Sequence, residues 1–88
     1  MNINGHEIID LNDINCDDVI GLRIKSIRTK KNLSQTALGV RMGQDQPYIS
    51  KLETGKIHLS DLILLSRIAV ALGVNVYDLI KKEENFIC

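Results

Sequence analysis

The sequence predicts an all-α domain of five short helices. Apolar residues recur at helical spacing in successive stretches, and most stretches open on an Asp, Ser or Asn and close on a glycine. The links between stretches are short, as in compact helical bundles. The chain has 88 residues, which suits one domain. We expect a helical domain over residues 17–82, with an N-terminal arm over 1–16 whose structure the pattern leaves open and a C-terminal tail over 83–88.

The first two predicted helices have clear starts and ends. The first begins at Asp17 or Asp18, whose carboxylate can accept free amide hydrogens of the first turn, and runs to about Lys31. The second follows Ser34 as its cap and ends at Gly43, where glycine allows a left-handed backbone.

The third predicted helix has Asp45 as its cap and stops at Gly55. Pro47 falls in its first turn, where the missing N–H costs nothing. Two short helices therefore flank a sharp turn at Gly43. Such a pair crosses at roughly a right angle, so the second helix stands out from the body. A helix in that position fits the major groove of DNA, which is about 12 Å wide.

The last two predicted helices complete the bundle. The fourth starts at Ser60 or Asp61 and ends at Gly73, with leucines and isoleucines at helical spacing between them. Asn75 caps the fifth, which runs to about Lys82.

The charge of the chain is neutral in total but unevenly distributed. Lys and Arg number 11, as do Asp and Glu. Residues 1–18 carry five acids and no Lys or Arg, whereas residues 19–58 carry eight bases against two acids. A local basic stretch is what a surface that faces phosphates needs, although a solvated charged face would have the same composition.

Several classes of function find no support in the sequence. It has no apolar run long enough for a membrane span and no secretory signal, so we expect a cytoplasmic protein with no membrane partner. Cys16, Cys88, His6 and His58 lack the spacing of metal ligands. There is no nucleophile–base motif and no glycine-rich phosphate loop, so we expect no enzyme, cofactor or metal.

The third predicted helix carries side chains able to read bases. Ile49 and Leu52 form its apolar side, and the rest is mostly short or amide-bearing. Glutamine can bond adenine at two points, lysine can bond guanine, and proline can touch a thymine methyl. An ordinary exposed helix is the alternative, since amides are also common on plain surfaces. The positions are Gln44, Asp45, Gln46, Pro47, Ser50, Lys51 and Thr54.

Residues 20–79 resemble the phage repressor/Cro-like (XRE-like) helix-turn-helix family. The resemblance implies a compact, five-helix, lambda-repressor-like domain that binds specific double-stranded DNA and regulates transcription. The residues that carry it are Ile24, Ile27-Arg28, Leu33-Ser34-Gln35, Leu38, Gly43, the stretch Tyr48-Ile-Ser-Lys-Leu-Glu-Thr-Gly-Lys56, and Ile68-Ala-Val-Ala-Leu-Gly-Val74.

The resemblance also implies a role for each site residue. Gln35 matches a glutamine that bonds a phosphate and braces the recognition helix. Glu53 matches a structural glutamate whose natural partner is Arg28, so Arg28 serves either structure or DNA. The implied base-reading residues are Gln44, Asp45, Gln46, Pro47 and Lys51, with the first two at the edge of that surface. The implied phosphate contacts are Arg28, Gln35, Tyr48, Ser50, Thr54 and Lys56.

The chain has more apolar residues than one small core requires. We predict that some of them, chiefly in the last two helices and the tail, form a homodimer interface, which suits a repressor on a two-fold operator. Alternatively, several of these apolar residues cover the N-terminal arm. The residues in question are Leu22, Val40, Ile63, Leu64, Val70, Ile80, Phe86 and Ile87.

Two other interpretations stay open. An antitoxin would carry the same domain, bind a toxin protein through the acidic arm or the tail, and autoregulate its promoter. A protein-interaction module that has lost its DNA surface is also compatible with the fold, because fold does not fix function.

Overall fold

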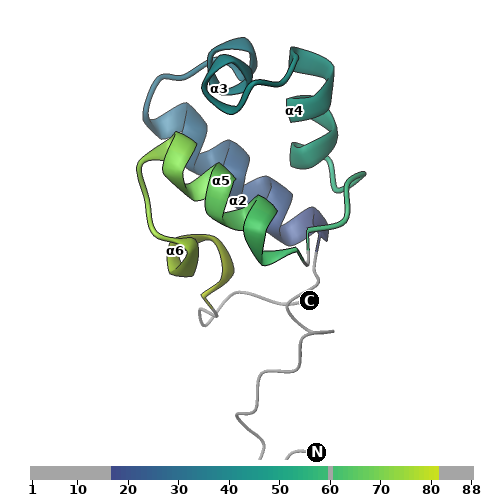
Figure 1. Ribbon diagram of the computed structural model, residues 1–88, viewed down its shortest axis with the longest axis vertical. Coiled ribbons are helices and arrows are strands. Elements are labelled where there is room, and N and C mark those ends of the chain that lie inside the picture. The colour runs from purple at the N-terminus through teal and green to yellow at the C-terminus, as the bar shows by residue number, and fades with distance from the viewer. Residues whose placement is uncertain (1–16, 60, 82–88) are drawn as a thin grey trace, which may run out of the picture.

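The computed structural model describes residues 17–59 and 61–81, and within them it contains five helices and no strand. The predicted all-α, five-helix class is confirmed. The predicted arm over 1–16, Ser60 and the tail lie outside the described residues. The helices are α2 (Asp17–Lys30), α3 (Gln35–Met42), α4 (Gln46–Glu53), α5 (Leu62–Leu72) and α6 (Val76–Ile80) (Figure 1).

Local chemistry explains most helix ends. Ser34, Asp45 and Asp61 cap α3, α4 and α5, each accepting a backbone N–H of the first turn at 2.9–3.1 Å. Gly43 and Gly73 end α3 and α5 with φ of 70° and 75°, a left-handed conformation that glycine adopts without strain.

The fifth helix is shorter than the sequence predicts. It ends at Ile80, because Lys81 has an extended backbone with ψ of 144°. The Arg23 guanidinium on α2 donates to the carbonyl oxygen of Lys81 at 2.8 Å. A side chain 58 residues away therefore satisfies a carbonyl at the point where the helix stops.

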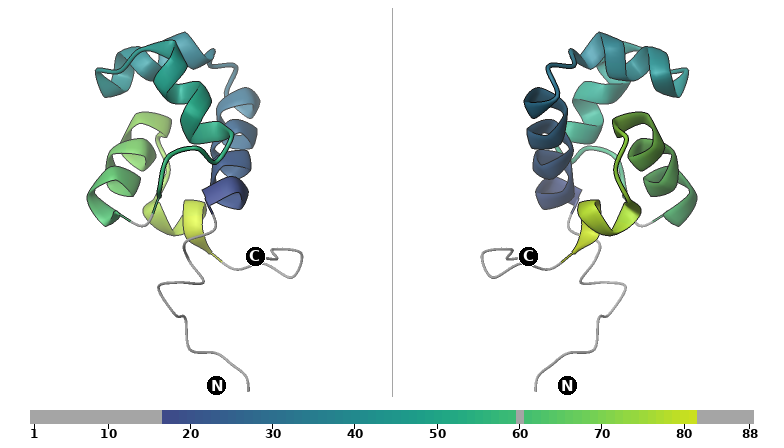
Figure 2. Two further views of the ribbon diagram at one scale, coloured as in Figure 1. Left: turned by 90° about the vertical axis from the view of Figure 1, so that its right-hand side faces the viewer. Right: turned by 90° about the vertical axis from the view of Figure 1, so that its left-hand side faces the viewer.

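The core lies between α2 and α5 and is closed at both ends. Figure 2 shows these two helices on opposite sides, with α3 across one end and α6 across the other. Every helix contributes to one cluster, so the bundle holds α4 rigidly against the body. The fully buried large side chains are Ile20, Ile24, Leu38, Ile49, Leu52, Leu59, Ile68, Leu72 and Leu79.

Gly21 allows α2 to approach the end of α4 very closely. A β-carbon built on it would lie 2.5 Å from the carbonyl oxygen of Leu52 and 2.9 Å from that of Glu53. Only glycine fits this contact without a backbone shift, and the contact sets how far α4 stands from α2.

Candidate nucleic-acid interface

Helix α4 presents a polar side to solvent and buries an apolar one. Ile49 and Leu52 are fully buried, and Tyr48 is half-buried against the core. The five residues assigned to base reading are all exposed. They occupy the start of α4, the turn before it and its outer face: Gln44, Asp45, Gln46, Pro47 and Lys51.

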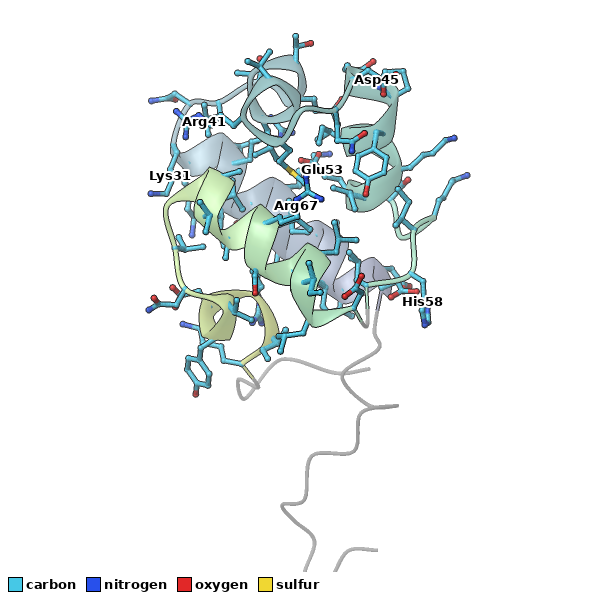
Figure 3. The ribbon with its side chains drawn as sticks, in the orientation of Figure 1. Lys31, Arg41, Asp45, Glu53, His58 and Arg67 are labelled. Atoms are coloured by element: carbon cyan, nitrogen blue, oxygen red, sulfur yellow. The ribbon has the colours of Figure 1, made fainter. Side chains whose placement is uncertain are left out.

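Asp45 already has a structural task. Its carboxylate accepts the backbone N–H of Tyr48 at 3.1 Å, which caps α4. Figure 3 shows Asp45 at the outer end of α4. The interpretation of Asp45 as a helix cap therefore has a geometric basis, and the helix dipole offsets part of its charge.

The residues assigned to phosphates differ in accessibility. Thr54 and Lys56 are exposed, whereas Tyr48, Ser50 and Gln35 are half-buried. Thr54 donates its hydroxyl to the carbonyl oxygen of Ser50 at 2.9 Å, which fixes its rotamer at the end of α4.

Arg28 is buried and committed to contacts within the domain. Its Nε lies 2.5 Å from Oε2 of Glu53, and its Nη2 lies 3.0 Å from Oε1. Its Nη1 donates to the carbonyl oxygen of Leu33 at 2.6 Å. Arg28 is 7% exposed and Glu53 3%. Of the two roles that the sequence left open for Arg28, this geometry supports the structural one.

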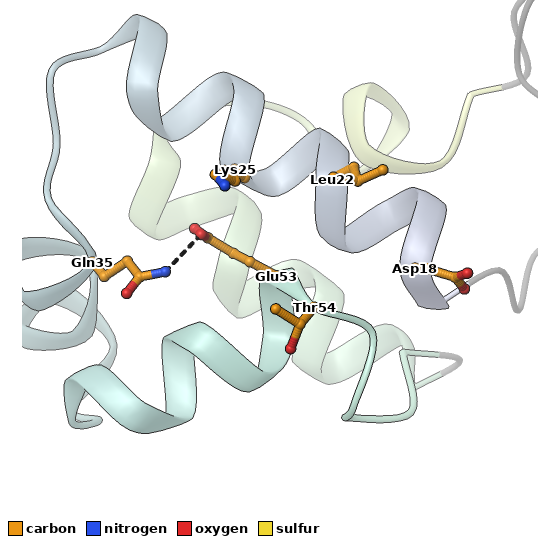
Figure 4. Close-up of a pocket in the computed structure, with 6 residues that line it drawn as sticks. All are labelled: Asp18, Leu22, Lys25, Gln35, Glu53 and Thr54. Carbon is orange, nitrogen blue, oxygen red and sulfur yellow. Dashed lines mark hydrogen bonds between the residues drawn. The ribbon is translucent and has the colours of Figure 1, made fainter.

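Two glutamines extend the Arg28–Glu53 pair toward the surface. Gln35 Nε2 donates to Glu53 Oε1 at 2.9 Å, as the dashed line in Figure 4 marks. Gln46 Nε2 in turn donates to Gln35 Oε1 at 2.6 Å. The four side chains Arg28, Glu53, Gln35 and Gln46 form a continuous chain of bonds, called here the polar relay.

The polar relay fixes which way each amide faces. A carboxylate only accepts, so it must take the N–H of Gln35 and leave the Gln35 oxygen for Gln46. Gln46 therefore keeps its carbonyl oxygen and one amide hydrogen, and neither makes a hydrogen bond within residues 17–59 and 61–81. An acceptor and a donor thus stand side by side at the start of α4.

Lys25 is a candidate contact that the sequence reasoning missed. It lines an open hollow of about 260 Å³ between α2 and α4, together with Gln35 and Thr54 (Figure 4). The available signal was its position three residues before Arg28, which puts both on one side of α2.

No helix in the described residues combines the length and apolar character needed to cross a bilayer. Nor do three His, Cys, Asp or Glu side chains gather within residues 17–59 and 61–81 closely enough to hold a metal ion.

Solved structures of transcriptional regulators share this fold. The restriction-modification controller protein C.AhdI from Aeromonas hydrophila is 31% identical over 70% of this chain and 92% of its own, with a TM-score of 0.65. A hypothetical transcription factor, NHTF, from Neisseria is 29% identical over 86% and 84%, with a TM-score of 0.67. The clp gene regulator ClgR from C. glutamicum is 27% identical over 72% and 80%, also with a TM-score of 0.67.

The family assignment rests on sequence as well as on fold. No curated protein matches the sequence significantly. A helix-turn-helix family model matches residues 24–79, which is more than half of the chain and spans α3, the turn and α4. The chain belongs to the phage repressor/Cro-like (XRE-like) helix-turn-helix family of DNA-binding transcriptional regulators.

Proposed function

We propose that this DNA-binding regulator is a cytoplasmic repressor that acts as a homodimer on a two-fold operator. In this proposal α4 enters the major groove and reads base edges, while side chains around it contact phosphates. Phosphate contacts supply register and most of the affinity, and the few groove contacts supply sequence preference.

The polar relay is the observation that carries the proposal. A neighbouring acceptor and donor on Gln46 match the N6 amino group and N7 of adenine. Because the relay fixes the orientation of the Gln46 amide before DNA binds, little side-chain entropy is lost when the amide bonds a base. We assign adenine to Gln46, guanine to Lys51 and a thymine methyl to Pro47.

The proposed phosphate contacts surround this surface. Lys56 lies just beyond α4, and Gln35 and Lys25 lie across the hollow from Thr54, whose hydroxyl hydrogen must leave the Ser50 carbonyl oxygen to reach a phosphate. Tyr48 and Ser50 complete the set as half-buried donors. Arg28 is left out because it is buried and bonds to Glu53 and Leu33 inside the domain.

The homodimer proposal rests on apolar side chains that the single domain leaves uncovered. Leu62 on α5 is 63% exposed and Tyr77 on α6 is 65% exposed. One module of this size buries little surface on DNA, so a second copy supplies specificity. Of the residues considered from the sequence, Leu64 and Ile80 are half-buried, and Phe86 and Ile87 lie outside the described residues.

The decisive experiment is selection of duplexes from a random pool by the full chain, followed by sequencing. We expect an enriched two-fold sequence whose half-sites lie about one helical turn apart, roughly 10 base pairs. Enrichment of one isolated half-site would contradict the homodimer. A pool that stays random after repeated rounds would contradict sequence-specific binding altogether.

A further inference from the structure

A second surface, on α3 and α5, combines apolar groups with positive charge. It is an open hollow of about 310 Å³, called here the α3–α5 groove. It is lined by Arg41, Met42, Ser66, Arg67, Val70 and Ala71. In Figure 3, Arg41 lies at the opposite edge of the molecule from Asp45, so this groove is separate from the reading end of α4.

The apolar part of the groove is open to solvent. Val70 in the groove is 80% exposed, and Val40, which precedes Arg41 on α3 outside the groove lining, is 74% exposed. Ile63, which is 71% exposed, lies on the same side of α5 as Arg67 and Val70 because the three are spaced by four and three residues. A strip of two apolar side chains with Arg67 between them therefore runs along α5 from its first turn into the groove.

The charge of the groove is positive. Arg67 is exposed and makes no hydrogen bond or ion pair within the described residues. Arg41 gives one guanidinium hydrogen to the carbonyl oxygen of Ala71 at 2.9 Å and keeps its other donors. Among the residues that the structure describes, none that lines the groove is acidic, so a matching ligand is both acidic and apolar.

The chain itself contains a segment of that chemistry. Residues 1–16 include three acids, no Lys or Arg, and several large aliphatic side chains. The acids alternate with the aliphatic residues in the order Glu7, Ile8, Ile9, Asp10, Leu11, Asp13, Ile14.

The place where this segment joins the fold brings it close to α5. Asp17, the first residue of α2, accepts the backbone N–H of Leu59 at 2.8 Å, and Leu59 lies two residues before the cap of α5. From Ile63 to Val70 the helix rises only about 10 Å, whereas 16 extended residues span up to about 50 Å. Residues 1–16 therefore have ample length to follow the strip into the groove.

We propose that the α3–α5 groove binds an acidic, apolar peptide, and that residues 1–16 of the same chain occupy it. The carboxylates pair with Arg41 and Arg67, and the aliphatic side chains cover Val70 and Val40. The short tether raises the effective concentration of the segment to the millimolar range, so modest contacts suffice. An outside protein that needs this face then has to displace the segment.

The test uses a nitroxide spin label on the full chain. The label is placed at Asn4→Cys, with Cys16→Ser and Cys88→Ser removing the native thiols. In dilute ¹⁵N-labelled protein we expect the amide signals of residues 66–70 to lose intensity. The charge-reversing variant Arg67→Glu should restore that intensity. Lys30→Glu is the matched control, since Lys30 is exposed but does not line the groove, and it should leave the loss unchanged.

Three results would overturn the proposal. One is unchanged intensity at residues 66–70 in the labelled protein, and another is a loss that Arg67→Glu does not relieve. The third comes from mixing spin-labelled chains that carry no ¹⁵N with ¹⁵N chains that carry no spin label: a loss at residues 66–70 in that sample makes a second copy the occupant. None of these readouts involves DNA, so their outcome does not depend on how the regulator binds DNA.

Discussion

The side chain of Glu53 connects the interior of the domain to its reading surface. Its carboxylate accepts from Arg28 at 2.5 and 3.0 Å and from Gln35 at 2.9 Å, while its own exposure is 3%. A carboxylate withdrawn from water to this degree needs charge-assisted bonds to offset lost hydration. If Gln46 reads a base as proposed, stability and base reading depend on the same group.

Replacing Glu53 with Gln should destabilise the fold strongly. The change leaves the buried Arg28 guanidinium without its counter-charge, and breaking a buried pair in this way costs about 3–5 kcal/mol. Urea denaturation of the two proteins measures the difference. The double variant Arg28→Met, Glu53→Leu should recover much of the loss. A Glu53→Gln variant as stable as the native chain would contradict a stabilising pair.

Removing the brace on Gln46 should weaken discrimination more than folding. We expect Gln35→Ala to reduce the preference for adenine at one operator position, at a cost of about 1–3 kcal/mol in binding, because Gln46 loses its fixed orientation. Titrations against operators that differ at that base measure it. Thr36→Ala, an exposed change on the same helix, should leave the preference for adenine intact. Equal preferences for adenine in the two variants would contradict the role of Gln35 in orienting Gln46.

Lys51 and Lys56 should separate base reading from phosphate binding. Lys51→Ala is expected to lose about 1–3 kcal/mol and to relax preference at one position. Lys56→Ala is expected to weaken binding to all sequences alike and to reduce the salt slope by about one. Binding isotherms over a range of salt concentrations distinguish the two. Identical salt slopes and identical base preferences would contradict both assignments.

At the scale of elements, the position of α4 depends on close backbone contact with α2. The backbone carbonyl oxygens of Leu52 and Glu53, in the last turn of α4, lie within 3 Å of the position that a β-carbon on Gly21 would take. Helix α2 therefore packs directly against the last turn of α4. Interiors packed this tightly do not absorb an extra methyl group without shifting backbone. The contact therefore couples the stability of α2 to the orientation of the reading helix.

Gly21→Ala should lower the free energy of unfolding by about 1–3 kcal/mol, although alanine is the better helix former. The added methyl group meets backbone oxygen, which cannot rotate away. Thermal unfolding followed by circular dichroism measures the effect. Ser26→Ala, on the exposed side of the same helix, should be neutral or slightly stabilising, and equal behaviour of the two variants would refute the close contact.

Sequence patterns located the elements well because their ends are set by nearby residues. Caps such as Ser34 and Asp45 act on amides three residues away, within reach of local reasoning. The end of α6 falls earlier than the pattern predicts, and the side chain that bonds the carbonyl oxygen there, Arg23, is remote in sequence. The bond between Gln46 and Gln35 has the same origin, since the turn must first fold the two helices together. Lys25 joined the candidate surface only through the packing of α2 beside α4.

At the scale of the whole molecule, the chain is neutral in total but places basic residues on two separate surfaces. Lys25, Lys51 and Lys56 are exposed around α4, and Arg41 and Arg67 line the α3–α5 groove. A basic face toward DNA steers association even when the total charge is zero. The antitoxin interpretation stays a prediction, because its toxin-facing segments lie outside the described residues.

Assembly should depend on Leu62 and Tyr77, the exposed apolar residues of α5 and α6 that lie outside the α3–α5 groove and its strip. We expect the native chain to sediment as a dimer at micromolar concentration and Tyr77→Glu to shift it toward monomer, because a charge replaces an aromatic ring at the interface. Thr29→Glu, an exposed change on α2, should leave the dimer unaffected. A monomeric native chain at high micromolar concentration, with and without DNA, would remove the dimer from the proposal.

The ion pair between Arg28 and Glu53 also restricts how the protein can evolve. The two residues lie 25 positions apart in the sequence, and the fold tolerates either buried charge only when the other is present. A lineage that loses either one passes through a form missing several kcal/mol, out of the 5–15 kcal/mol that typical domains possess. Descendants should therefore keep both residues or exchange both, and a chain with only one of them should carry a compensating change nearby.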